Sequence, residues 1–313
     1  MIIFKTVLLQ VAVLFILIFV GLFLTKTHVL TKPGTKSITN VVLYLVTPCV
    51  IIKSFINTKY SKDTLKGLLL SFLAATVVHL VFILLATVVF RDKSDSRRRV
   101  LRFAAIFGNC GFMSLPIQEA ILGNEGLLYG AAFVAIFNLF SWTYGIMEMS
   151  GDKNSISVRK VIFNPGIIGL AVGLVIFIFA IPLPSAIKLP VEYFAALNTP
   201  LPMLIIGYHL AKLDFKVAVR DFRCLFCSIT RILIFPVIAL AVIYGLGFLI
   251  PDLRGNLFVS MMIAACSPAA AYTAIFSFKF KQDTDLSVNL VSLSTLLSII
   301  SMPILITLAK IIA

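Results

Sequence analysis

Long apolar runs follow one another along almost the whole chain. A helix that crosses a membrane needs about 20 mostly apolar residues, and the runs lack the alternating pattern of membrane β-barrel strands. We therefore predict an all-α integral membrane protein with ten spanning helices, each of which satisfies its own backbone hydrogen bonds. The predicted spans, numbered 1 to 10, are 3–25, 37–57, 65–90, 100–122, 127–149, 163–184, 191–212, 222–249, 255–279 and 285–311.

The composition excludes a soluble protein. Of the 313 residues, 60% are hydrophobic and 13% are charged, whereas soluble domains have about 45–50% apolar and about 25% charged residues. So few charged side chains cannot cover a folded surface in water. Disorder is excluded as well, because disordered segments are poor in apolar residues.

The basic residues are unevenly divided between the two sides of the predicted spans. The net charge of +14 would suggest nucleic-acid binding in a soluble protein, but cytoplasmic loops of membrane proteins also collect Lys and Arg. Of the 26 basic residues other than Arg231, 18 lie in the loops after spans 1, 3, 5, 7 and 9. We therefore predict a multi-pass protein of the cell membrane (plasma or inner membrane) with both termini outside the cytoplasm. Its expected surroundings are the lipid bilayer, and no nucleic acid is expected as a partner.

Three pairs of landmark residues share a spacing of 152 residues. The pairs are Gly21 and Gly173, Thr47 and Thr199, and Pro116 and Pro268. This spacing predicts a duplicated unit of five helices, with residues 1–152 as the first repeat and 153–313 as the second. Because five is odd, the second repeat enters the membrane from the opposite side. Inverted repeats are typical of transporters whose substrate site lies near the midplane, where interrupted helices meet.

Helix-breaking residues interrupt spans 4 and 9. Span 4 contains the string GNCGFMSLPIQEA at 108–120, in which Pro116 removes a backbone donor and Gly108 weakens the helix. Span 9 contains the matching pair Ser267 and Pro268. We predict that both helices unwind and cross near the midplane, where their half-helix N-termini suit a carboxylate. The alternative is that each proline only kinks its helix.

The string GNCGFMSLPI is similar to the Gly-Asn-x-Gly-Phe-x-x-x-Pro segment of the auxin efflux carrier family, which includes the bacterial malonate and malate permeases. Three further strings resemble the family: TPCVIIKSF at 47–55, NPGIIGLAVG at 164–173 and SPAAAYTAIFS at 267–277. The similarity covers essentially the whole chain. The connector at 150–162 is short, whereas plant auxin carriers have a long cytoplasmic insertion there, so the chain resembles a short bacterial member.

The resemblance implies a fold and a function. Family members have ten helices in two inverted five-helix repeats, a fold of the bile-acid-symporter and auxin-carrier type, with broken helices 4 and 9 that cross. Spans 1, 2, 6 and 7 would form a scaffold, and spans 3–5 and 8–10 would form a moving core. By resemblance, Asn109, Pro116 and Pro268 would lie at the crossing, and the cargo would be a small organic anion such as malonate, malate or an auxin-like acid.

Polar and helix-breaking residues near the predicted crossing are candidates for contact with the substrate. They are Thr47, Asn109, Cys110, Ser114, Pro116, Asn138, Thr199, Ser267, Pro268 and Tyr272. Their side chains and the neighbouring backbone amides could hold a carboxylate. The alternative for many of them is a hydrogen bond between helices, which is a common use of polar residues in membranes.

Ionisable residues inside the spans need an explanation, because a charge at the bilayer centre costs at least about 2.5–3.5 kcal/mol. Glu119 and His79 are candidates for coupling transport to H⁺ or Na⁺, since histidine titrates near neutral pH. Glu119 could instead lie near the outer end of span 4, either paired or with its carboxylate extended to the membrane surface. Arg231, at the position of span 8 equivalent to His79, either attracts an anionic substrate or extends to the cytoplasmic edge, and we favour the second. Lys53 in span 2 leaves the same two interpretations open.

These patterns predict a secondary active transporter, either a symporter or an antiporter, that works by alternating access with an elevator movement. We expect no cofactor, no metal ion and no enzymatic activity, and a homodimer is compatible with the sequence. One alternative is a membrane-embedded enzyme that uses His209 and Asp214, a spacing that some membrane acyltransferases use for general-base chemistry. Another alternative is a passive anion channel.

Overall fold

The fold consists of helices, with no β-strand, in the part of the chain that the computed structural model describes, residues 2–313. Seven helical runs of this part are long and apolar enough to cross a membrane. They are Phe4–Lys26, Lys32–Ile56, Lys62–Val89, Cys110–Ser150, Ser185–Leu210, Phe222–Leu249 and Thr284–Ile312. These runs support the expectation of an integral membrane protein with many helices. The arrangement as ten helices in two inverted repeats stays a prediction.

Four of the ten predicted spans are not single long helices. Predicted span 6 contains only the 14-residue helix α9 (Pro165–Ile178). Predicted span 9 is divided into α15 (Asn256–Ala265) and α16 (Tyr272–Lys279). Predicted spans 4 and 5 share the 41-residue run Cys110–Ser150. That run turns at Gly123, whose φ of 65° is readily adopted only by glycine.

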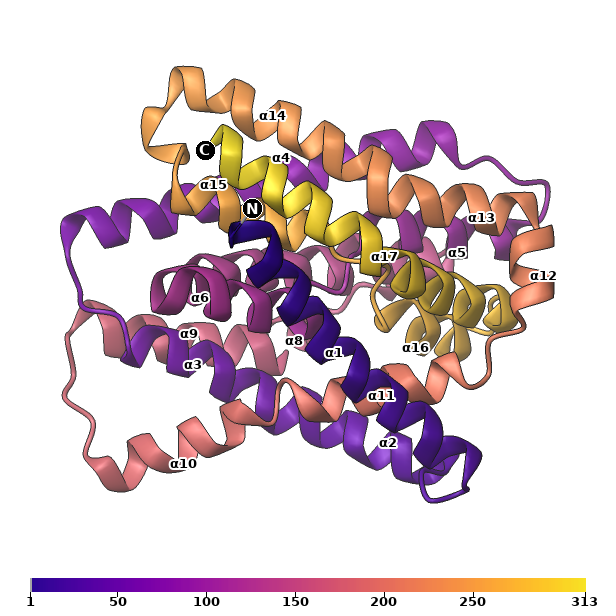
Figure 1. The fold of residues 1–313 in the computed structure, drawn as a ribbon, viewed down its shortest axis with the longest axis horizontal. Coiled ribbons are helices and arrows are strands. Elements are labelled where there is room, and N and C mark those ends of the chain that lie inside the picture. The colour runs from indigo at the N-terminus through magenta and orange to yellow at the C-terminus, as the bar shows by residue number, and fades with distance from the viewer. Residues whose placement is uncertain (1) are drawn as a thin grey trace.

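The helices form two groups, of which the first lies mainly in the lower part of Figure 1 and the second mainly in the upper part. The first group comprises α1 (Ile2–Lys26), α2 (Lys32–Val41), α3 (Thr47–Ile56), α9, α10 (Ser185–Ala196) and α11 (Pro200–Leu210). The second comprises α4 (Lys62–Val89), α5 (Asp95–Ile106), α13 (Phe222–Ile229), α14 (Phe235–Leu249), α15, α16 and α17 (Thr284–Ile312). Helix α6 (Leu115–Phe140) contacts helices of both groups, and α1 also packs on α17. The short helices α7 (Ile146–Ser150), α8 (Val158–Ile162) and α12 (Phe215–Arg220) lie in connecting segments.

Glycines allow the helices of the first group to approach one another closely. A Cβ atom at Gly207 in α11 would collide with the carbonyl oxygen of Ile18 in α1, and one at Gly21 would collide with the backbone of Leu204. Gly169 in α9 packs in the same way against Pro48 in α3. Small residues at such contacts are typical of helix packing in membranes.

Three helices widen into a π-helical turn shortly before a proline. The turns are η1 (Val42–Val46) before Pro48, η2 (Cys110–Ser114) before Pro116 and η5 (Thr230–Ile234) before Pro236. Proline lacks an N–H group and its ring clashes with the preceding turn, so the helix widens there. At η1 the Thr47 hydroxyl donates to the Val42 carbonyl over 2.9 Å and so gives that oxygen a hydrogen-bond partner.

An ion-pair cluster ties together the ends of three helices in the second group. Arg97 in α5 pairs with Asp92, with Asp221 before α13 and with Asp283 before α17. Asp221 also caps α13, because its carboxylate accepts from the N–H groups of Arg223 and Cys224. Partial burial by itself raises the pKa of Asp221. The hydrogen bond from Arg97, these backbone N–H groups and the Arg97 charge together lower it below its ordinary value of 3.8.

We expect Asp221→Asn to lower the melting temperature at neutral pH by about 1–3 °C, since a partly exposed ion pair contributes little. Asparagine is also a good N-cap residue, so the variant removes the charge but keeps the cap. A carboxyl whose pKa is lowered by folding stabilises the protein above its unfolded pKa and loses this effect as the pH falls below it. The difference between wild type and variant should therefore shrink as the pH falls below about 3.8. Thermal unfolding in detergent at several pH values tests this, and a pH-independent difference would contradict it.

Candidate functional site

Two helices are interrupted at the same place in the molecule. Helix α5 ends at Ile106 and its chain resumes as a helix at Cys110, while α15 ends at Ala265 and its chain resumes at Tyr272. The two interruptions pair as a short antiparallel bridge. The Asn109 N–H donates to the Pro268 carbonyl over 2.7 Å, and the Ala270 N–H donates to the Phe107 carbonyl over 2.9 Å. The predicted meeting of two broken helices is thus present in the structure.

The interruption in predicted span 4 lies before Pro116 and not at it. Gly108 and Asn109 carry the bridge, whereas Pro116 is in the first turn of α6. Proline is well tolerated there because the first N–H groups of a helix have no intrahelical partner. Pro268 differs, since it lies within the interruption itself.

Arg231 fills the space behind the bridge. Its side chain is 1% exposed, so the expectation that it extends to the cytoplasmic edge is wrong. The guanidinium donates to the carbonyls of Ala265 and Ser267 over 2.9 Å, and to those of Ala105 and Ile106 over 3.2 and 3.3 Å. Three of these carbonyls belong to the last residues of α5 and α15, which have no partners within their own helices, and that of Ser267 lies just beyond α15. A single side chain therefore binds both interrupted helices.

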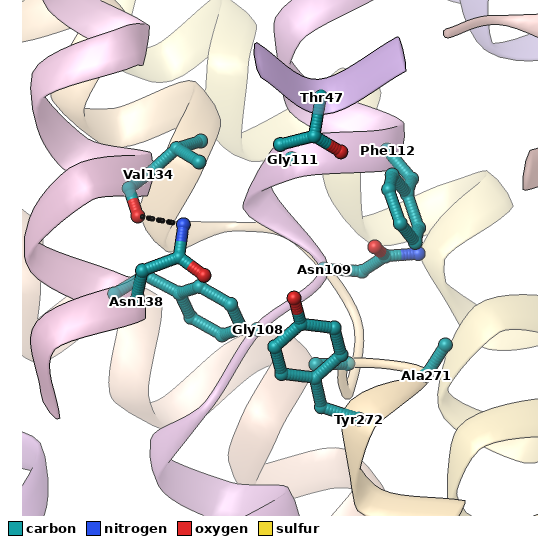
Figure 2. Close-up of a pocket in the computed structure, with 11 residues that line it drawn as sticks. Thr47, Gly108, Asn109, Gly111, Phe112, Val134, Asn138, Ala271 and Tyr272 are labelled. Atoms are coloured by element: carbon teal, nitrogen blue, oxygen red, sulfur yellow. Dashed lines mark hydrogen bonds between the residues drawn. The ribbon is translucent and has the colours of Figure 1, made fainter. Parts of the chain in front are cut away.

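The first cavity lies on the other side of the bridge, where the second halves of the two helices begin. Its lining residues are Thr47, Gly108, Asn109, Gly111, Phe112, Val134, Phe137, Asn138, Ala270, Ala271 and Tyr272, and its volume with the open mouth is about 330 Å³. Four of the predicted substrate-binding residues lie here: Thr47, Asn109, Asn138 and Tyr272. Figure 2 shows their polar groups arranged around the same space. The lining contains no charged side chain.

The polar side chains of the first cavity differ in their hydrogen bonding. The Thr47 hydroxyl donates to Val42, and the Asn138 amide donates to the Val134 carbonyl over 2.9 Å (Figure 2). The amide nitrogen of Asn109, in contrast, is buried and has no hydrogen-bond partner, although the residue is only 4% exposed. A buried donor without a partner is rare in native proteins, so Asn109 is the group most suited to bind a ligand oxygen.

A second cavity, with a volume of about 300 Å³ including its open mouth, is lined by another part of the predicted site, including Pro116, Glu119 and Thr199. Lys53 of α3 lies there too and pairs with Glu119 of α6, with 2.6 Å between Nζ and Oε1. Glu119 is therefore paired with a cation in the structure. Asn198 also lines this cavity, and its amide donates to the carbonyl of Gly111, a residue of the first cavity, over 3.1 Å.

The remaining predicted site residues line neither cavity. The hydroxyl of Ser114 donates to the Ile263 carbonyl over 3.0 Å, and that of Ser267 donates to Ala264 over 2.8 Å. Cys110 is 1% exposed. His79 is buried, its Nδ1 lies 2.7 Å from the Ala75 carbonyl oxygen, and its ring stacks on Phe140.

The sequence profile of the membrane transport protein family matches residues 6–306, nearly the whole chain. The chain belongs to this family. It is the auxin efflux carrier family, so the resemblance carried by the string at 108–117 is confirmed. The carrier is also similar to two archaeal proteins, each named an uncharacterized transporter. One, from Methanothermobacter thermautotrophicus, is 25% identical over 92% of this chain and 94% of its own length, and the other, from Methanocaldococcus jannaschii, is 27% identical over 93% and 94%.

The geometry of the carrier gives no support to general-base chemistry at His209 and Asp214. One carboxylate oxygen of Asp214 accepts from the Val217 N–H over 3.0 Å and so caps α12. His209 packs edge-on against Tyr208, with 5.6 Å between ring centroids. Neither residue lines either of the two cavities.

The apolar walls of the first cavity and the contact between Gly108 and Arg231 are not apparent from the sequence. Phe112, Val134 and Phe137 resemble any other apolar residue of a membrane helix. Gly108 was identified only as a helix breaker. In the structure a Cβ atom at this position would collide with the guanidinium of Arg231 and the hydroxyl of Ser267.

We expect Gly108→Ala to destabilise the carrier by about 1–3 kcal/mol, as overpacking of a buried site does. The added methyl group would displace Arg231 from the carbonyls that it binds. Gly111→Ala is the matched control, because the nearest side-chain atoms to its Cβ are the Val134 methyl groups at 4.0 Å. Thermal unfolding of both variants in detergent tests this, and equal melting temperatures would contradict the assigned contact.

Proposed function

We propose that the carrier is a secondary active transporter of a small organic anion, a mono- or dicarboxylate, which binds in the first cavity. The observation that carries this proposal is the amide of Asn109, a buried donor without a partner at the cavity wall. Leaving such a group unpaired is unfavourable, and a carboxylate oxygen would satisfy it. Ala271 and Tyr272, at the start of α16, and Gly111 in η2 also line the cavity, and helix N-termini favour negative charge.

The position of the cavity supports transport by alternating access. Thr47 belongs to the first group of helices, whereas Asn109 and Tyr272 belong to the broken helices of predicted spans 4 and 9. An elevator movement of one group past the other would change the side from which the cavity is reached. In this proposal the first group is the scaffold of spans 1, 2, 6 and 7, and spans 3–5 and 8–10 are the core. The ten spans form two inverted repeats in the cell membrane, with both termini outside the cytoplasm.

The ion pair between Lys53 and Glu119 supports coupling to H⁺ or Na⁺ at the second cavity. It joins α3 of the first group to α6, so it would break and re-form as the groups move. The Glu119 side chain is 41% exposed and lines the second cavity, where we propose that an ion reaches it. We therefore prefer Glu119 to the buried His79 as the coupling residue.

We expect Asn109→Ala and Asn109→Asp to lower the apparent affinity for the transported carboxylate about 10- to 100-fold, since a hydrogen bond to a charged group contributes about 1.5–3 kcal/mol. The aspartate has the size of asparagine but repels an anion. Asn124→Ala, at the exposed turn around Gly123 within α6, is the control. A thermal-shift screen of mono- and dicarboxylates would identify the ligand, and saturable uptake into vesicles would measure its transport. Normal uptake by both Asn109 variants, or uptake that does not saturate, would overturn the proposal.

We expect Glu119→Gln to flatten the dependence of uptake on pH or on sodium, because the glutamine keeps the size but cannot bind a proton or an ion in the same range. Glu125→Gln is the matched control on the same helix. Glu125 accepts hydrogen bonds from Tyr129 and Asn256 and lines neither cavity. Uptake by vesicles under imposed pH and sodium gradients measures the effect. If Glu119→Gln and wild type respond alike, Glu119 is not the coupling residue.

A further inference from the structure

We propose that Arg231 sets the charge of the cargo, so that the first cavity takes one monovalent anion in preference to a dianion or a neutral molecule. This inference rests on the proposed function, because it concerns the ligand of the same cavity. It is carried by the charges that meet at the crossing and by the position of Arg231 directly behind the cavity wall.

Four helix ends meet at the crossing. Helices α5 and α15 end there, and the helices that begin with Cys110 and Tyr272 start there. A helix carries about half an elementary charge at each end, negative at its C-terminus and positive at its N-terminus. Two ends of each sign meet, so their sum is close to zero.

Arg231 adds one full positive charge to this balance. Among residues 2–313 no carboxylate lies within ion-pair distance of its guanidinium, whose hydrogen bonds go to four carbonyl groups. The ring of Phe82 also lies close to Arg231, with the guanidinium carbon 5.3 Å from the ring centroid. The crossing therefore carries a net charge of about +1 when the cavity holds no ion.

A single glycine separates this charge from the first cavity. Gly108 lines the cavity on one side, and on its other side a Cβ atom would collide with Nη2 of Arg231. Both the guanidinium and the bridge are buried, so water does not screen the charge well, and Coulomb interactions are strong in such surroundings. The positive charge thus acts on the ligand although Arg231 does not touch it.

One negative charge in the cavity neutralises the crossing. A monocarboxylate, or a dicarboxylate with one proton bound, supplies that charge and also accepts from the free Asn109 amide. A neutral amide leaves the guanidinium without a counterion. A dianion brings a second negative charge, and no charged side chain lines the cavity to meet it.

The first test uses wild-type carrier and compares acids with their uncharged analogues. The probes are butyrate, benzoate and phenylacetate, their primary amides, and the dianions succinate and malonate at alkaline pH. We expect the best monocarboxylate to bind at least about tenfold more tightly than its amide and than either dianion. The reason is that the buried guanidinium of Arg231 is unfavourable without a counterion, and a second negative charge in the cavity is unfavourable as well. Equal binding of an acid and its amide, or tighter binding of a dianion, would overturn the inference. Failure of every acid to bind and to be transported would overturn the proposed function and the inference with it.

The second test changes Arg231 and measures the ratio of affinities for acid and amide. Arg231→Lys keeps the charge and should keep the preference for the acid. Arg231→Gln keeps hydrogen-bond donors but no charge, and it should reduce the ratio at least about tenfold. A loss of structure alone would weaken acid and amide binding equally. Arg254→Gln removes an exposed charge that stacks on Phe248, and it should leave the ratio unchanged.

Gel filtration and melting temperature show whether each Arg231 variant is folded. If Arg231→Gln folds and keeps the wild-type ratio of acid to amide affinity, the inference is wrong. If it does not fold, the comparison of probes on the wild-type carrier decides the question by itself, with the outcomes given above.

Discussion

The crossing depends on the hydrogen bonds of one buried guanidinium. A broken helix inside a membrane leaves carbonyl groups without partners, and each unsatisfied group costs several kcal/mol in hydrocarbon. Arg231 donates to four such carbonyls, two from the segment at Ala105 and Ile106 and two from that at Ala265 and Ser267. Arginine suits this position because it offers five donors in a rigid planar arrangement. The bridge between Gly108 and Ala269 then holds the two interruptions against each other.

This arrangement separates the two kinds of helix end. The carbonyl ends face Arg231, and the amide ends face the first cavity. The cavity is therefore suited to an anion although its lining consists only of neutral residues. A lysine or arginine in the lining would bind an anion directly but would also hold it tightly, whereas helix ends and a charge behind the wall leave the ligand in contact with neutral groups such as Asn109 and Tyr272.

The contacts between the two groups of helices are of a different kind from those inside each group. Within the first group, glycines such as Gly21 and Gly207 let backbones touch. Within the second group, Arg97 ties three helix ends together. Between α3 and α6, at the second cavity, the polar contact is the partly exposed ion pair of Lys53 and Glu119. Exposed ion pairs contribute little stability, so this boundary is better suited to movement than the interiors of the groups.

The sequence by itself determined the membrane location, the approximate positions of the helices, the two interruptions and the family, because hydropathy, helix-breaking residues and the string at 108–117 are local properties of the chain. The partners of the buried polar groups were decided only by the tertiary structure. Arg231 was expected at the membrane edge, yet it lies at the crossing, because in a medium without water a charged group is most stable where unpaired carbonyls from distant segments converge. The side chains of Ser114 and Ser267 were candidates for the site, but Ser114 bonds to Ile263 in α15, and Ser267 bonds to Ala264 at the end of the helix that precedes it. The amide of Asn109, from the same motif, is left free at the cavity. No local pattern distinguishes these cases, since partners such as Ala105 for Arg231 and Ile263 for Ser114 lie more than 100 residues away in the chain.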